Sequence, residues 1–172
     1  MRTVSITLAA ALALLAGFAA GAQEFVFESA EPRFTVTIPG IPPLRMGPHP
    51  MRDTHPHLRF QGAEGAYSVS IITPGAAPGM SARECASATL RSLAARPSVP
   101  PIEEMYRTRL DEATFAVIYA TQMPGFLQLN AHLLSAAAGT HCVEVHASKI
   151  ATSEDDVAPW FGGFGKARIA AP

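Results

Sequence analysis

The chain has 172 residues, 48% of them hydrophobic, and a formal net charge of −1 from 13 basic and 14 acidic side chains. This length suits one domain with its own core, and the Lys and Arg residues form no run or stripe. The composition therefore excludes the basic surface that neutralises nucleic-acid phosphates, so no nucleic-acid partner is expected. Eleven arginines against two lysines, with abundant alanine, favour a GC-rich bacterial gene.

Residues 1–22 follow the order of a secretory signal peptide. A positive charge at Arg2 precedes a long apolar segment, and the small-x-small sequence Ala-Gly-Ala ends at Ala22. No cysteine follows this point directly, so a lipid anchor would have no attachment atom. The sequence predicts cleavage after Ala22, a single mature domain over 23–172 without a transmembrane anchor, and a periplasmic or secreted location.

The first predicted elements of the mature chain are short strands. Residues 34–38 alternate apolar and polar side chains and end at a Pro-Gly turn. Five prolines within 41–56 then predict an extended loop without a buried element. Residues 58–61 and 67–72 alternate again and form a predicted hairpin.

A helix is predicted to begin after Ser81 and to run to about Ala95. Ser81 and Glu84 have the spacing of a capping box, and Met80 and Cys85 have that of a hydrophobic staple. Prolines after residue 96 end the helix. The side chains expected to face inward are Ala82, Cys85, Ala86, Thr89 and Leu93.

Two more hairpins are predicted, 102–110 with 114–120 and 126–135 with 140–148. In the second of these, leucines and valines alternate with polar side chains, so a register that unites the apolar face also unites the polar one. The polar face would carry Gln128, Asn130, His132, Cys142, Glu144 and His146.

The last predicted helix follows a capping signal formed by Ser153 and Asp156. Its apolar stripe is Val157, Trp160, Phe161 and Phe164, which suits the leucine and valine face of the hairpin. The helix that carries Cys85 is then left for the polar face. The expected fold is therefore α+β, a three-layer sandwich of a central antiparallel sheet with helices on both faces.

Cys85 and Cys142 are the two cysteines of the chain. In an oxidising compartment a disulfide between them is the leading interpretation, and closing so long a loop would contribute about 4 kcal/mol. The alternative is a pair of buried free thiols that pack as small hydrophobic side chains.

The chain resembles the Mog1/PsbP-like fold, including small exported bacterial members of the DcrB type. The resemblance rests on Phe25-x-Phe27, on the segment from Phe34 to Pro42, on the order of hairpins and helix, and on the terminal helix after Ser153. The resemblance spans nearly all of the mature chain. It implies an interaction scaffold more than a reaction, and it brings no catalytic motif to carry over.

Two groups of residues could bind a metal. The proline-rich loop holds thioether and imidazole ligands that suit copper, namely Met46, His49, Met51, His55 and His57. The alternative for this loop is a solvated segment dominated by its prolines.

On the predicted sheet, His132, Glu144 and His146 could hold zinc or iron, or perform acid–base chemistry. The alternative is a structural hydrogen-bonded network under the first helix. A bridged Cys142 could not serve as a thiolate ligand, so the disulfide and a metal site that includes this cysteine exclude each other.

The sequence therefore predicts an exported, non-enzymatic binding or accessory protein of the bacterial periplasm, with another envelope protein as its partner and no cofactor. A copper or zinc binder that uses the loop is the second hypothesis, and an enzyme that uses His132 and Glu144 is the third. No glycine-rich phosphate loop or nucleophile motif favours a particular reaction.

Overall fold

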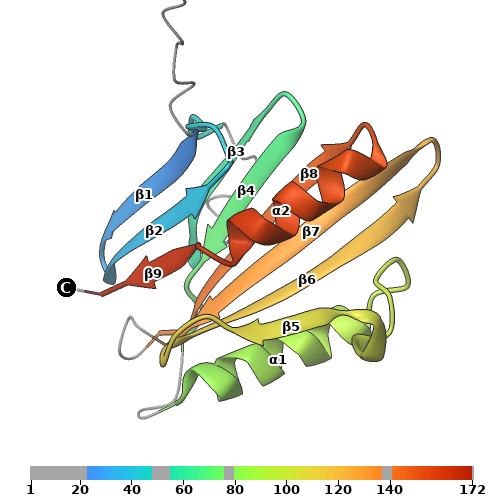
Figure 1. The fold of residues 1–172 in the computed structure, drawn as a ribbon. Coiled ribbons are helices and arrows are strands. Elements are labelled where there is room, and N and C mark those ends of the chain that lie inside the picture. The colour runs from blue at the N-terminus through green and yellow to red at the C-terminus, as the bar shows by residue number, and fades with distance from the viewer. Residues whose placement is uncertain (1–22, 48–54, 76–79, 137–140, 172) are drawn as a thin grey trace, which may run out of the picture.

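A computed structural model describes residues 23–47, 55–75, 80–136 and 141–171, and it shows a mixed α+β fold (Figure 1). The described strands form two sheets in which every strand pair is antiparallel, and two α-helices pack on them. The predicted signal peptide lies outside the described residues.

The smaller sheet has the order β1-β2-β9 and is formed by β1 (Glu24–Ala30), β2 (Arg33–Pro39) and β9 (Arg168–Ala170). The sequence predicted β2, but it predicted no strand at the carboxyl end of the chain. Only three residues of β9 pair with β2, too few to give an alternating pattern. The inward face carries Phe25, Phe34, Val36, Ile38 and Ile169, all buried.

The larger sheet has the order β3-β4-β8-β7-β6-β5. Its strands are β3 (Leu58–Glu64), β4 (Tyr67–Ile72), β5 (Tyr106–Arg109), β6 (Thr114–Met123), β7 (Phe126–Ser135) and β8 (Val143–Ala151). The three predicted hairpins are β3 with β4, β5 with β6, and β7 with β8. Pairing between β4 and β8, far apart in the chain, joins them into one sheet.

Several predicted strand boundaries are wrong, and β3 and β6 each run three residues past their predicted ends at 61 and 120. The segment predicted as a strand from residue 102 begins instead with a 3-10 turn, η2 (Ile102–Glu104), in which Met105 N–H donates to the Ile102 carbonyl. Because Pro101 opens this turn, β5 starts only at Tyr106. The carboxyl end of β8 also differs from the prediction, because the strand continues to Ala151 instead of stopping at residue 148.

Helix α1 (Ala82–Ala94) begins at the predicted capping box. Ser81 N–H donates to Glu84 Oε2 over 2.8 Å, and Glu84 N–H donates to Ser81 Oγ over 3.3 Å. Four of the five side chains predicted to face inward are buried, namely Ala82, Cys85, Ala86 and Leu93, and the fifth, Thr89, is half-buried. Helix α1 packs against β6 and β7, where Val117, Tyr119 and Leu134 belong to the same buried cluster as Leu93.

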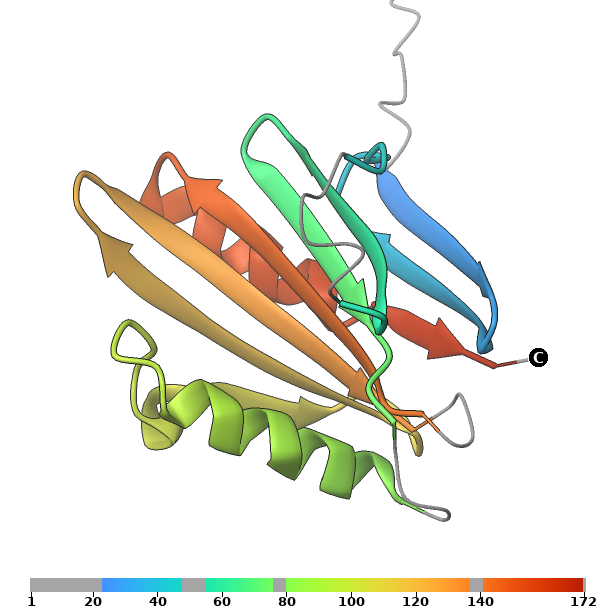
Figure 2. The ribbon, with the colours of Figure 1, turned by 180° about the vertical axis from the view of Figure 1, so that it is seen from behind.

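Helix α2 (Val157–Phe164) follows a 3-10 turn, η3 (Glu154–Asp156), and Asp156 Oδ2 accepts the Ser153 N–H as the predicted cap. Trp160 and Phe164 join Leu129, Ala131 and Leu133 in the main core, so this stripe covers the leucine and valine face as predicted. Figure 1 shows α2 lying across the sheet in front, and Figure 2 shows α1 on the side seen from behind.

Over the residues that the structure describes, no helix is both long and apolar enough to cross a membrane.

Candidate functional site

Polar side chains form two rows that run across the strands of the larger sheet. In the first row Gln61, Ser70, His146 and His132 stand opposite one another on β3, β4, β8 and β7. In the second row Ala63, Ser68, Ser148, Asn130 and Tyr119 do the same and extend to β6. The predicted gathering of polar residues on one face is therefore confirmed for Asn130, His132, Glu144 and His146.

The inner end of the first row is a buried hydrogen-bonded chain under α1. His132 Nδ1 lies 3.2 Å from Glu144 Oε1, and the hydroxyl of Thr89 on α1 donates to Glu144 Oε2 over 3.0 Å. On the other side of the imidazole, the Tyr119 hydroxyl lies 3.3 Å from His132 Nε2. Because a carboxylate only accepts, Nδ1 carries the proton of the His132–Glu144 bond.

His146 belongs to a second chain of hydrogen bonds. Asn130 Nδ2 donates to the Gln128 carbonyl over 3.2 Å and to Thr121 Oγ1 over 3.3 Å. Since a carbonyl oxygen can only accept, this bond assigns the amide orientation and leaves Oδ1 facing His146 Nε2 at 3.1 Å. Nε2 is therefore the donor, and Nδ1 of a neutral His146 carries a lone pair.

Ring stacking joins the two chains of hydrogen bonds. The His132 and His146 rings lie 4.5 Å apart between centroids at 14°, and the Tyr119 ring lies 5.9 Å from that of His132 at 12°. Three adjacent strands thus each contribute one ring to a single stack. His132 is only 2% exposed, so this imidazole is part of the interior.

Burial shifts the pKa values of the cluster. It lowers the pKa of His146 to about 4, with His132 and Arg96 acting in the same direction and Glu144 opposing them. Burial raises the pKa of Tyr119, so its hydroxyl keeps its proton. Burial also acts to raise the pKa of Glu144, but the hydrogen bond and charge of His132, the hydrogen bond from Thr89 and the charge of His146 together outweigh it and leave this pKa below its ordinary value.

A disulfide between Cys85 and Cys142 ties α1 to the residue that precedes β8. The predicted bridge is confirmed, and the alternative of two free thiols is wrong. Bridged Cys142 cannot act as a thiolate, so it is neither a metal ligand nor a nucleophile in this state. The bridge holds α1 over the face on which Thr89 meets Glu144.

The predicted copper loop is described only at its ends. Met46 is 47% exposed, and His55 and His57 are also exposed. His49 and Met51 lie outside the described residues. Within the described ranges, no group of three or more His, Cys, Asp or Glu side chains is placed to hold a metal ion. The two hypotheses of a metal site stay untested.

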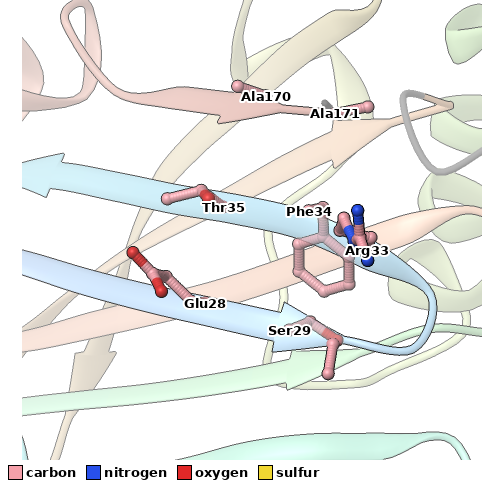
Figure 3. A pocket seen from close by; sticks show the side chains of 8 residues that line it. Glu28, Ser29, Arg33, Phe34, Thr35, Ala170 and Ala171 are labelled. Carbon is pink, nitrogen blue, oxygen red and sulfur yellow. The ribbon is translucent and has the colours of Figure 1, made fainter.

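Several surface depressions lie on the described part of the chain. An open one of about 550 Å³ borders β1, β2 and β9, where Figure 3 shows Glu28 and Arg33 well apart and no cluster of reactive groups. A second depression, of about 340 Å³, borders β3, β4 and β8 and has His146 in its wall. His146 is thus a candidate site residue that borders a surface depression.

The chain Glu144, His132, Tyr119 has the order carboxylate, imidazole, hydroxyl that acid–base relays use. The hydroxyl here belongs to a tyrosine that is 6% exposed, and no depression described above is lined by Tyr119, His132 or Glu144. The arrangement suits a structural network that orients α1 on the sheet.

Sequence reasoning missed three participants, Thr89 as a hydrogen-bond donor, Tyr119 and Ser70. The spacing of the residues could have indicated two of them. Thr89 shares the inward face of its helix with Cys85, and alternation along β6 puts residues 117, 119 and 121 on one face. What the sequence lacked was the register of β4 on β8 and of β6 on β7.

The chain matches no known protein-family model, and it matches no curated protein.

Proposed function

We propose that this chain is an exported accessory protein of the bacterial envelope that works by binding rather than by catalysis. The charge pattern of residues 1–22 and the Cys85–Cys142 bridge both suit an oxidising compartment outside the cytoplasm. Its expected partner is another envelope protein, and it needs no cofactor.

A Mog1/PsbP-like three-layer sandwich is the fold that we propose for it. The supporting features are the N-terminal hairpin that carries Phe25 and Phe34, the packing of α1 with the Leu134 cluster, and the packing of α2 with the Leu133 cluster. Leu133 and Leu134 are neighbours on β7 and therefore point to opposite faces of the sheet. The scaffold role that this family implies agrees with the binding function.

The observation that carries the proposal is the internal use of the acid–base residues. Glu144 bonds to both His132 and Thr89, and His132 bonds also to Tyr119, so the cluster satisfies its own hydrogen bonds beneath a helix that a disulfide holds in place. Buried polar networks of this kind order a core. A catalytic cluster would need an opening to its reactive atom.

Expression of the full chain in a Gram-negative host tests the proposal. We expect the protein in the periplasmic fraction with an intact mass that begins at Gln23, and with Cys85 and Cys142 joined in a non-reducing peptide map. A variant with Arg2→Glu and an Asp in place of Leu12 serves as the control that should stay in the cytoplasm. Recovery of the unaltered chain from the cytoplasm, with Met1 retained, would refute the export part of the proposal.

The binding part has its own readout. Glu144→Gln keeps the shape of the side chain and removes its charge, so it should lower stability and leave partner binding intact once the variant is folded. If the exported protein instead showed a turnover that Glu144→Gln abolished in a folded variant, catalysis would replace binding as the function.

A further inference from the structure

The part of the larger sheet that α1 leaves open carries a group of uncharged polar side chains. Helix α1 lies on the side of the sheet that faces the viewer in Figure 2 and packs mainly on β6 and β7. The same face over β8, β4 and β3 carries Ser148, Ser70, Ser68 and Gln61. The depression of about 340 Å³ lies on this face. We call the four side chains Gln61, Ser68, Ser70 and His146 that line it the polar shelf.

Residues 45–47 pack closely against the edge of β3 beside the polar shelf. Gly47 N–H donates to the Gln61 carbonyl over 2.9 Å, so the chain at residue 47 continues the hydrogen bonding of β3. A side chain at position 62 would bring its Cβ within 2.5 Å of the Arg45 carbonyl oxygen, a distance at which the backbone would have to move. Glycine at this position therefore lets residues 45–47 lie against the edge and form one wall.

Three hydrogen-bonding groups of the polar shelf have no recorded partner within the described part of the chain. They are the Gln61 amide, the Ser70 hydroxyl and His146 Nδ1, and they stand opposite one another on three successive strands. Neighbouring strands lie about 4.8 Å apart, which sets the spacing of the row. Ser68 differs, because its hydroxyl bonds to that of Ser148 over 2.8 Å.

The row offers both kinds of hydrogen bond. His146 Nδ1 can only accept, because Nε2 donates to Asn130 and the ring is neutral. The Gln61 amide and the Ser70 hydroxyl can donate or accept. Among the residues that the structure describes, no Asp, Glu, Lys or Arg lines the depression, so no described side chain of the wall compensates a charged ligand.

We infer that the polar shelf binds a small neutral molecule with several hydroxyl groups, a sugar or a polyol, with one hydroxyl donating to His146 Nδ1 and others meeting Ser70 and Gln61. A hydroxyl both donates and accepts, so a polyhydroxylated ligand matches all three groups at once. The volume lies at the lower end of the range of about 300–1,000 Å³ for small-molecule sites. This inference rests on the proposed binding function and names a ligand class for it.

Nuclear magnetic resonance with maltose as the probe tests the inference. Few hydrogen bonds and no aromatic platform predict a dissociation constant of about 1 mM. We expect saturable shifts of the amide signals of Gln61, Ser70 and His146. The ¹⁵N resonance of His146 Nδ1 should also move, because this atom gains a donor, while the Nε2–H signal stays in place.

Two variants make the test selective. Ser70→Ala should weaken maltose about fivefold, the effect of one net hydrogen bond. Ser87→Ala removes the same hydroxyl from α1, where Ser87 donates to the Arg83 carbonyl, and should leave the affinity unchanged. Glucuronate, which adds a carboxylate, should bind more weakly than maltose because no Lys or Arg of the described residues lines the wall.

Absent or non-saturable shifts, equal losses in the two serine variants, or tighter binding of glucuronate would each overturn the inference. A stoichiometric zinc site that moved the His146 Nδ1 signal would also overturn it in favour of a metal ligand. These outcomes are separate from the export readout, since a chain that is exported and ignores maltose would end only the inference. A chain that binds maltose and stays in the cytoplasm would end only the export proposal.

Discussion

Protonation of His146 should make the stability of the fold depend on pH between neutrality and about 4. Burial, with contributions from His132 and Arg96, lowers the pKa of this imidazole from 6.5 to about 4, and Glu144 acts in the opposite direction. In the unfolded chain the imidazole takes up a proton near its ordinary pKa, whereas in the folded chain it does so only near 4. Between these two values the unfolded state holds more protons, so the free energy of unfolding falls as the pH falls.

The magnitude follows from the two pKa values. Each pH unit in this interval is worth about 1.4 kcal/mol, so lowering the pH from 6.5 to 5 should remove about 2 kcal/mol. The full interval down to about 4 would remove about 3 kcal/mol, reduced somewhat because the ring borders an open depression. Protonation of Glu144 also lowers the free energy of unfolding, but only near and below its ordinary pKa of 4.5. The interval from pH 6.5 to 5 therefore separates the effect of His146 from that of Glu144.

Urea unfolding at pH 7.0, 6.5, 5.5 and 5.0 measures the effect, and the fluorescence of Trp160, the single tryptophan, reports it. His146→Gln keeps a hydrogen-bonding side chain without a titrating group, so its free energy of unfolding should lose about 2 kcal/mol less than the unaltered protein between pH 6.5 and 5. His57→Gln, at an exposed position, should behave like the unaltered protein. Equal losses in the unaltered protein and in His146→Gln would refute the reasoning.

Three further predictions concern the bridge, the core and metals. Cys85→Ala combined with Cys142→Ala should lower the free energy of unfolding by about 4 kcal/mol, because the bridge closes a loop of 57 residues; an unchanged urea midpoint would contradict this. Trp160→Ala should cost about 3–5 kcal/mol by circular dichroism, whereas His57→Ala should cost less than about 0.5; similar melts would show that α2 is not a core element. Calorimetric titration with Cu(I), Cu(II) and Zn(II) should give no stoichiometric site tighter than micromolar, and if one appeared, its loss in Met46→Leu with Met51→Leu would place it in the loop.

Local sequence signals determined the helices and the hairpins of this protein. The Ser81–Glu84 capping box placed the start of α1 because its contacts lie within one turn of helix. The stripe of Trp160 and Phe164 assigned α2 to the leucine face for a similar reason, since residues three and four apart share one side of a helix. Two cysteines behind a predicted signal peptide were enough to predict the bridge.

Pairing between segments that are distant in the chain decided which residues meet in the polar shelf and in the hydrogen-bonded chain under α1. No local sequence pattern encodes this pairing. The sequence grouped His132, Glu144 and His146 by parity, but only the register of β4 on β8 places Ser70 beside His146 and thereby forms the polar shelf. Likewise, only the register of β6 on β7 and the position of α1 bring Tyr119 and Thr89 into the buried chain. Strand register depends on the packing of both faces at once, and so the tertiary structure decided which of these polar side chains bond to one another.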